Sequence, residues 1–233
     1  MILREKHIRA QEEANSFLDL LSAYDATLIT YPLEYEKLKL AISERFDILI
    51  EEIHGLTVRE VKDHLDRLGL PWPSESVEDD TELSGFFYSA EPNARFIFLD
   101  ASDNEERKKF SLLHEVCHFL KECFWSYHRD QQPVIAMRCT SHDLVAKCNT
   151  TTSTDKVVDD HGNFKEWVCN WFAAEVLMPV QDIADLEKSW KRKKMSKDQV
   201  ADCIKSQFQV SRSAAGIRTI DLKIGQRKYP FKK

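Results

Sequence analysis

The sequence predicts an α+β protein that is mostly helical, with a small mixed or antiparallel sheet directly before its central helix. Apolar residues recur at helical spacing along most of the 233 residues. Two short β-favouring runs, Gly85 to Tyr88 and Arg95 to Asp100, flank a Ser-Ala-Glu-Pro-Asn turn and predict a hairpin. The second run leads into a helix over Asn104 to Leu120, which carries the sequence His-Glu-Val-Cys-His at 114–118.

Composition limits the class of protein and its partners. The chain is long enough for one substantial domain or one domain with a small appendage, and 42% hydrophobic and 31% charged residues are typical of a globular protein. No apolar run approaches the length of a membrane span, and the charged first 13 residues lack the apolar core of a secretory signal. We therefore expect a cytoplasmic protein without a membrane partner, whose six cysteines are mostly free thiols.

The net charge of −6 argues against nucleic-acid binding by the surface as a whole. The stretch Lys188 to Lys197 is nevertheless locally basic. A solvated helix end or loop is the favoured interpretation of this stretch, ahead of a phosphate-binding site, because runs of charge are usually solvent-facing.

Apolar periodicity and helix-breaking residues place the elements before the hairpin. The first helix carries apolar residues on one face, at Ala10, Ala14, Phe17, Leu18 and Leu21. The third helix should begin with a capping box formed by Thr57 and Glu60. The predicted elements are helices over 3–24, 33–44 and 57–68 and a strand over 46–53, with a surface loop over 74–83.

The central helix carries the chemistry. Ser102 and Glu105 are predicted to form its capping box, and an apolar stripe packs it on one side, at Phe110, Leu113, Cys117 and Leu120. His114 and His118, four residues apart, project from the same face, so both imidazoles can reach one divalent metal ion. Glu115 lies between them, where its carboxylate can take a proton from a water activated by the metal. This arrangement is suited to hydrolysing an amide bond.

The chain after the central helix begins with a weakly periodic stretch, 123–165, which we expect to be the least ordered part. Within it, Cys139, His142 and Cys148 lack a fourth partner, so free thiols are favoured over a second, structural zinc site. Four helices should follow, over 164–177, 180–190, 197–208 and 211–222. The last two have the pattern of a helix-turn-helix, although two helices covering a core are favoured over DNA contact.

A catalytic zinc usually has three protein ligands, so the histidine pair needs a third. The helix over 164–177 is almost wholly apolar and nonetheless carries Glu166 and Glu175. Burying a carboxylate is costly unless it is paired or bound to a metal. The two glutamates lie on opposite sides of the helix and cannot serve the same metal. We prefer Glu166, because it begins the helix and Asn170 lies one turn later on the same face, where its amide can orient a ligand.

These two segments are similar to the ImmA/IrrE family of zinc metallopeptidases. The similarity lies in Phe110 to Leu120, followed by Glu166 to Pro179, and the strands before the central helix also resemble the family's sheet. It implies a zincin-like metallopeptidase domain over 1–180, with insertions near 54–80 and 123–163, and a C-terminal helix-turn-helix-like region over 181–233. One departure is Cys117, which stands where the family usually has glycine.

The resemblance implies that His114, His118 and Glu166 bind zinc, with manganese as an alternative, and that Glu115 is the general base. Family members cleave helix-turn-helix repressors, which derepresses stress, phage or mobile-element genes. Residues that could assist the oxyanion are Tyr127, His128, His142 and His161. The run Arg95 to Leu99 could align an extended substrate by strand addition.

The alternative function is a non-proteolytic regulatory protein that binds a repressor or DNA through its C-terminal helices. The intact set of histidines and glutamates favours the enzyme, since a non-catalytic descendant has no need of Glu115.

Overall fold

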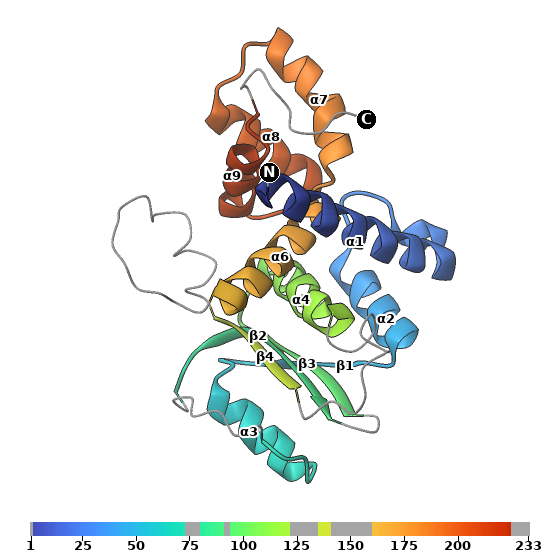
Figure 1. The fold of residues 1–233 in the computed structure, drawn as a ribbon, viewed down its shortest axis with the longest axis vertical. Helices are drawn as coiled ribbons and strands as arrows, with labels where there is room; N and C mark the ends of the chain where they lie inside the picture. Colours follow the sequence, from blue (N-terminus) through green and yellow to red (C-terminus); the bar gives the residue numbers. More distant parts are fainter. Residues whose placement is uncertain (1, 73–79, 91–93, 122–134, 141–159, 225–233) are drawn as a thin grey trace. The chain divides into compact units, whose positions relative to one another are not determined.

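The computed structural model describes residues 2–72, 80–90, 94–121, 135–140 and 160–224 (Figure 1). The chain divides into two compact units, one formed by residues 35–160 and the other by residues 1–34 together with 161–233. Helices predominate and the strands form one small sheet, which confirms the α+β class. The predicted division of the chain at residue 180 stays a prediction.

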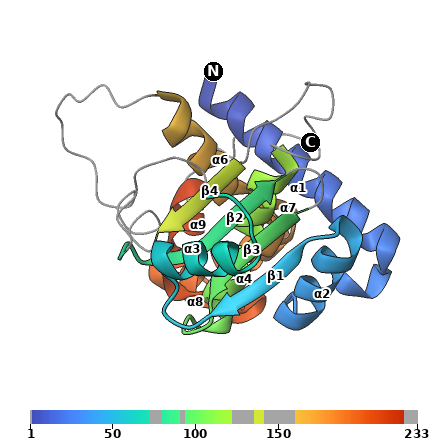
Figure 2. The ribbon, with the colours of Figure 1, turned by 90° about the horizontal axis from the view of Figure 1, so that it is seen from below.

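The sheet belongs to the unit formed by residues 35–160 and has four strands in the order β1-β3-β2-β4 (Figure 2). The predicted hairpin is confirmed, since β2 and β3 pair antiparallel with Gly85 opposite Leu99. The strand β1 runs parallel to β3, and β4 runs antiparallel to β2. The strands are β1 (Leu49–Ile53), β2 (Leu83–Ala90), β3 (Ala94–Asp100) and β4 (Ile135–Thr140).

Two features of this sheet differ from what the sequence indicated. The strand β4 lies inside the stretch 123–165, where no strand was predicted, and it pairs with β2 from Ser89 opposite Ile135 to Leu83 opposite Thr140. Residues 123–134 and 141–159 lie outside the described part, so the expectation that this stretch is the least ordered stays a prediction. A strand of six residues is too short to show a clear apolar alternation in the sequence. Whether such a segment forms a strand depends on its partner strand. Substrate addition to β3 is also excluded, because β1 and β2 already pair with its two edges.

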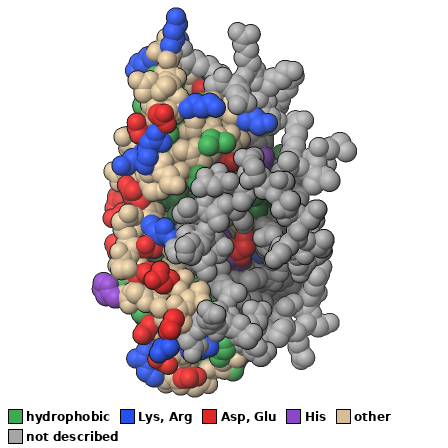
Figure 3. All heavy atoms as spheres, turned by 90° about the vertical axis from the view of Figure 1, so that its left-hand side faces the viewer, with side chains coloured by type: hydrophobic (Ala, Val, Ile, Leu, Met, Phe, Trp, Pro, Cys, Tyr) green, Lys and Arg blue, Asp and Glu red, His purple; other side chains and the backbone are tan. Residues whose placement is uncertain are grey.

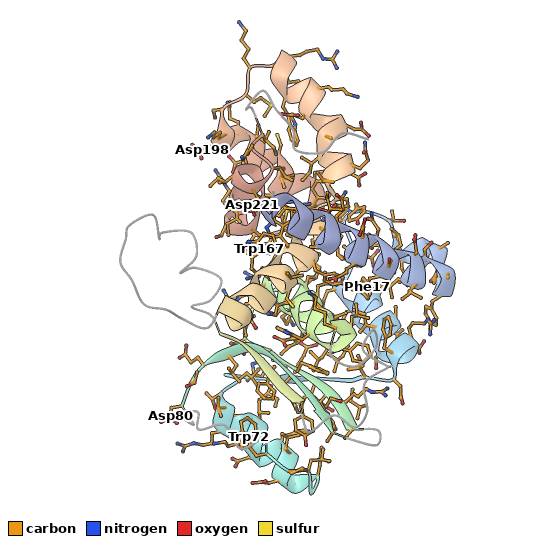
Figure 4. All side chains as sticks on the ribbon, viewed as in Figure 1. Phe17, Trp72, Asp80, Trp167, Asp198 and Asp221 are labelled. Atoms are coloured by element: carbon orange, nitrogen blue, oxygen red, sulfur yellow. The ribbon has the colours of Figure 1, made fainter. Side chains whose placement is uncertain are left out.

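Helices cover both faces of this sheet. The helix α4 (Glu105–Phe119) lies against β2, β3 and β4, and α3 (Val58–Arg67) lies on the opposite face (Figure 1). Alternate side chains of β2 therefore enter different cores, with Phe87 against Phe119 of α4 and Phe86 in the cluster under α3. This double coverage explains why almost every residue of β2 is buried. Trp72, beside α3, stacks on Phe86 at a ring distance of 5.5 Å (Figure 4).

Glu52 of β1 ties this strand to two helices, α2 (Tyr35–Phe46) and α4. Its carboxylate accepts hydrogen bonds from the Tyr35 hydroxyl at 3.0 Å and from Lys108 Nζ at 2.8 Å, and it pairs with Lys39. Burial raises the pKa of Glu52, but the hydrogen bonds from Lys108, Lys39 and Tyr35 outweigh burial and hold the pKa at about 2. The network stabilises the packing of α4, the helix with the histidine pair.

The depressed pKa of Glu52 predicts how stability depends on pH. A carboxylate whose pKa is lower in the folded than in the unfolded chain contributes its full stability above the ordinary value of 4.5 and loses it as the pH falls toward 2. The urea midpoint of the wild type should therefore fall more steeply between pH 5 and 2.5 than that of Glu52→Gln. Glu51→Gln, which removes a carboxylate from the same strand, is the matched control and should keep the wild-type slope. Equal slopes for Glu52→Gln and the wild type would contradict this assignment.

The second unit is helical in its described part. On α1, the predicted apolar positions Ala10, Ala14, Phe17 and Leu21 are fully buried. The helix α6 begins at Asp160, earlier than predicted, whereas the boundaries of α7, α8 and α9 lie within two residues of the prediction. The helices are α1 (Ile2–Tyr24), η1 (Ala26–Leu28), α6 (Asp160–Leu177), α7 (Val180–Arg192), α8 (Lys197–Phe208) and α9 (Arg212–Asp221). None of the helices in the described part of the chain has the length and apolar character needed to cross a membrane.

A buried ion pair joins α6 to α9 within this unit. Arg218 pairs with Glu175, and both are almost fully buried. The guanidinium also donates to the Met178 carbonyl, at 2.8 Å from Nη2, and the Val180 N–H donates to Glu175 at 3.0 Å. The Arg218 guanidinium lies 5.2 Å from the ring centre of Trp171, which also stacks on a histidine of α1. Glu175 can therefore lie on an apolar helix because a cation and an N–H group satisfy its carboxylate.

Candidate metal centre

The central helix α4 begins with side-chain capping. Asn104 is its N-cap, and the Asn104 side chain accepts a hydrogen bond from the Arg107 N–H at 2.9 Å. The predicted capping box of Ser102 and Glu105 is wrong, because the Ser102 hydroxyl donates instead to Asp100 at 2.7 Å. Asp100 holds Ser102 in the turn that follows β3, so the helix begins at Glu105. The cap fixes the start of the helix, three turns before the histidine pair.

The two histidines of α4 face each other in the interior. His114 and His118 are each 1% exposed, and their Nε2 atoms are 3.1 Å apart. Two nitrogen ligands at ~2.0–2.1 Å from a tetrahedral zinc ion lie about 3.3–3.4 Å from each other. The observed separation is close to that value. The pair therefore fits a shared divalent metal ion without a change of helix geometry.

The predicted third ligand, Glu166, lies on α6 in the other unit of the chain. Its part in the metal centre stays a prediction. Two imidazoles and one carboxylate are a donor set of catalytic zinc sites, which leave a fourth position open. Glu166 and Asn170 are half-buried on α6. Glu175, the other glutamate of this helix, is engaged by Arg218.

Glu115 is fully buried and lies against β2 at Gly85. A Cβ atom at position 85 would lie 3.0 Å from both Cγ and Oε1 of Glu115. The preceding residue, Ser84, accepts a 2.7 Å hydrogen bond from Arg107 Nη2, which fastens the strand to the first turn of α4. From the sequence alone, Gly85 was predicted only to be a strand residue. A glycine within a strand, here directly before Phe86, Phe87 and Tyr88, is the signal that could have indicated a close approach.

Several candidate residues lie outside the described part of the chain. Tyr127, His128 and His142 are among them, and His161 belongs to α6 by its backbone although its side chain is not described. Their roles in assisting the oxyanion stay predictions. The same holds for the thiols of Cys139 and Cys148, whereas Cys117, Cys169 and Cys203 form no disulfide bond among the described residues. Cys117, which departs from the family pattern, is fully buried on α4.

Comparison with known proteins supports a metallopeptidase-type domain. Residues 74–122 match the family Peptidase_M78, described as the IrrE N-terminal-like domain. The matched stretch contains the hairpin and α4 with His114, Glu115 and His118. The match confirms the predicted resemblance to the ImmA/IrrE family over this part of the chain, and it indicates a metallopeptidase.

The structure is also similar to a solved structure described as a Mycobacterium tuberculosis transcriptional regulator. The TM-score is 0.40 and the sequence identity 12%, and the match covers 99% of this chain and 54% of that chain. The chain thus spans about half the length of that solved structure. A search of curated proteins found no match.

Proposed function

We propose that the protein is a zinc-dependent, site-specific endopeptidase that cleaves a helix-turn-helix transcriptional repressor and so derepresses stress, phage or mobile-element genes. The observation that carries the proposal is the buried pair of His114 and His118, whose Nε2 atoms are 3.1 Å apart, beside the buried carboxylate of Glu115. The match of residues 74–122 to the IrrE N-terminal-like domain supports it.

Each residue of the centre has a separate role in this proposal. His114, His118 and Glu166 hold the metal ion, zinc or alternatively manganese, and the amide of Asn170 orients Glu166. A divalent metal ion, when bound, lowers the pKa of a water toward neutrality and polarises the peptide carbonyl. Glu115 accepts a proton from the attacking water and delivers it to the leaving nitrogen. The burial of Glu115 keeps its carboxylate out of bulk solvent.

The sheet limits how an extended substrate could bind. In the described part of the chain, β1 and β4 are the edge strands. Backbone pairing with a substrate would use one of these edges rather than the central strand β3. Side-chain pockets would then set the sequence that is cleaved.

The second candidate is a regulatory protein that binds a repressor without cutting it. Ile220 of α9 is 68% exposed, but a single exposed apolar side chain is common on protein surfaces and does not favour this candidate by itself. Direct DNA contact through α9 is disfavoured, because its two arginines are engaged within the chain. Arg212 pairs with Asp198 and Asp202, and Arg218 is buried. Asp198 lies at the start of α8 (Figure 4).

Exposed basic side chains lie elsewhere, at the turn between α7 and α8. Lys and Arg side chains are visible at the upper end of the face in Figure 3. The exposed basic residues of this stretch are Lys188, Arg192, Lys193, Lys194 and Lys197. Lys188 has a carboxylate neighbour, Asp185, at 3.6 Å. We retain the interpretation of a solvated helix end, and DNA contact and a cytoplasmic location stay predictions.

Labelling of new protein N-termini tests the proposal. Zinc-loaded wild-type protein is added to a lysate of its own cells, and new N-termini are identified by mass spectrometry. We expect a cut in a helix-turn-helix protein that is absent with chelator and absent with zinc-loaded Glu115→Gln. A helix-turn-helix protein that is retained on the immobilised, zinc-loaded wild type but stays intact would contradict the enzyme and favour the regulatory alternative.

A further inference from the structure

The contact between Gly85 and Glu115 links a strand to the proposed general base. Glu115 has no exposed surface, so its carboxylate cannot move into solvent when a neighbour grows. An added Cβ at position 85 would meet the Glu115 Cγ and Oε1 at 3.0 Å and the carboxyl carbon at 3.4 Å. Contacts of 3.0 Å are tighter than ordinary van der Waals packing, so the carboxylate or the strand would have to shift.

The strand cannot easily supply that shift. Ser84 is held by the Nε and Nη2 atoms of Arg107, at 3.2 and 2.7 Å, and Arg107 itself pairs with Asp103 at 3.0 Å. Gly85 pairs with Leu99 of β3 on one side and with Cys139 of β4 on the other. The register of the β2–β4 pairing shifts just before Gly85. Phe87, two residues along, packs on Phe119 of α4. The strand is therefore fixed before and after Gly85, and the displaced group would be the carboxylate.

We propose that Gly85 is a positioning residue of the metal centre, because the missing side chain forms the recess in β2 that fixes the place of the Glu115 carboxylate. The catalytic consequence rests on the proposed function, while the packing claim does not. Proton transfer depends on a base within hydrogen-bond reach of the reacting water, so a displacement of the carboxylate by an ångström lowers turnover. The three atoms nearest to an added Cβ all belong to Glu115, so we expect metal binding by the histidines to change little.

A double-mutant cycle tests the packing claim without a substrate. The proteins are the wild type, Gly85→Ala, Glu115→Asp and the double variant, each unfolded in urea with chelator present. Aspartate withdraws the carboxylate by one methylene and makes room for the added methyl group. We expect Gly85→Ala to lower the urea midpoint in the wild-type background and to lower it less than half as much in the Glu115→Asp background. Gly85→Ala alone could fail to fold. If the double variant folds in that case, the result supports the packing of Glu115 against Gly85 equally well.

Gly216→Ala is the matched control. Its Cβ would meet only Arg212 Nη1, at 3.5 Å, which is an ordinary contact, so the urea midpoint should not fall. An equal cost of Gly85→Ala in both Glu115 backgrounds, or no cost at all, would overturn the proposal.

Kinetics test the consequence for the proposed reaction. On the protein found to be cleaved in the lysate, Gly85→Ala should lower kcat by about tenfold to a hundredfold, with KM and the zinc dissociation constant changed by less than about threefold. An unchanged kcat would overturn the positioning role. If the lysate yields no cleaved protein, the proposed function fails, and the urea cycle still decides whether Gly85 holds Glu115.

Discussion

Replacing Glu115 by glutamine should lower kcat by about 10²–10⁴-fold, the usual contribution of a positioned general base. The amide keeps the size of the side chain that fills the recess at Gly85 but cannot accept a proton from the attacking water. Zinc affinity should stay within a few-fold of the wild type, because both imidazoles and Glu166 are retained. Single-turnover cleavage of the identified substrate and competition with a chromogenic chelator measure the two quantities.

Glu106→Gln is the control for this variant, since it removes a carboxylate from the first turn of the same helix. It should cleave at the wild-type rate. Full proteolysis by Glu115→Gln would show that another group takes the proton. Loss of zinc binding in Glu115→Gln would show instead that Glu115 holds the metal ligands in place rather than accepting a proton from the water.

Replacing Arg218 by methionine should destabilise the protein by about 3–5 kcal/mol, because Glu175 would be left as a buried charge without its cation. Arg218 and Glu175 have side chains only 1% and 3% exposed. The double variant Arg218→Met with Glu175→Leu should recover most of this loss, since apolar groups of similar volume can replace a buried pair. Urea unfolding at pH 7, followed by circular dichroism, gives the free energies.

Arg212→Met is the matched control on the same helix. Arg212 is 41% exposed and pairs with Asp198 and Asp202, both on the surface, and exposed ion pairs contribute only about 0–1 kcal/mol. A cost of Arg218→Met no larger than that of Arg212→Met would contradict the role of the buried pair in joining α6 to α9.

Local patterns predicted the elements that position the histidines. Three features could be predicted from short-range apolar periodicity and from the residues that begin or end helices and strands. They are the spacing of His114 and His118, the hairpin before them and the helices near the C-terminus. The capping box was placed wrongly because Ser102 has a local competitor, Asp100, for its hydroxyl. The capping-box rule considers only the spacing of two residues, so it does not show when a neighbouring polar group competes for the same hydrogen bond.

Contacts between distant residues could not be predicted in this way. The strand β4 depends on pairing with β2, more than forty residues earlier in the chain. The apolar pattern indicated that Glu166 and Glu175 each needed a partner, yet Arg218, which satisfies Glu175, lies 43 residues away on another helix. The recess at Gly85 likewise depends on how α4 approaches the sheet. Such contacts are set by packing rather than by the local pattern.

X-ray absorption at the zinc edge tests whether His114, His118 and Glu166 bind one metal ion. For the zinc-loaded protein we expect two imidazole nitrogens at ~2.0–2.1 Å with oxygen ligands at ~2.0–2.2 Å. Glu166→Ala should retain both imidazoles with weaker zinc affinity. A spectrum without imidazole scattering, or zinc affinity unchanged in both Glu166→Ala and His118→Ala, would contradict metal binding by these three residues.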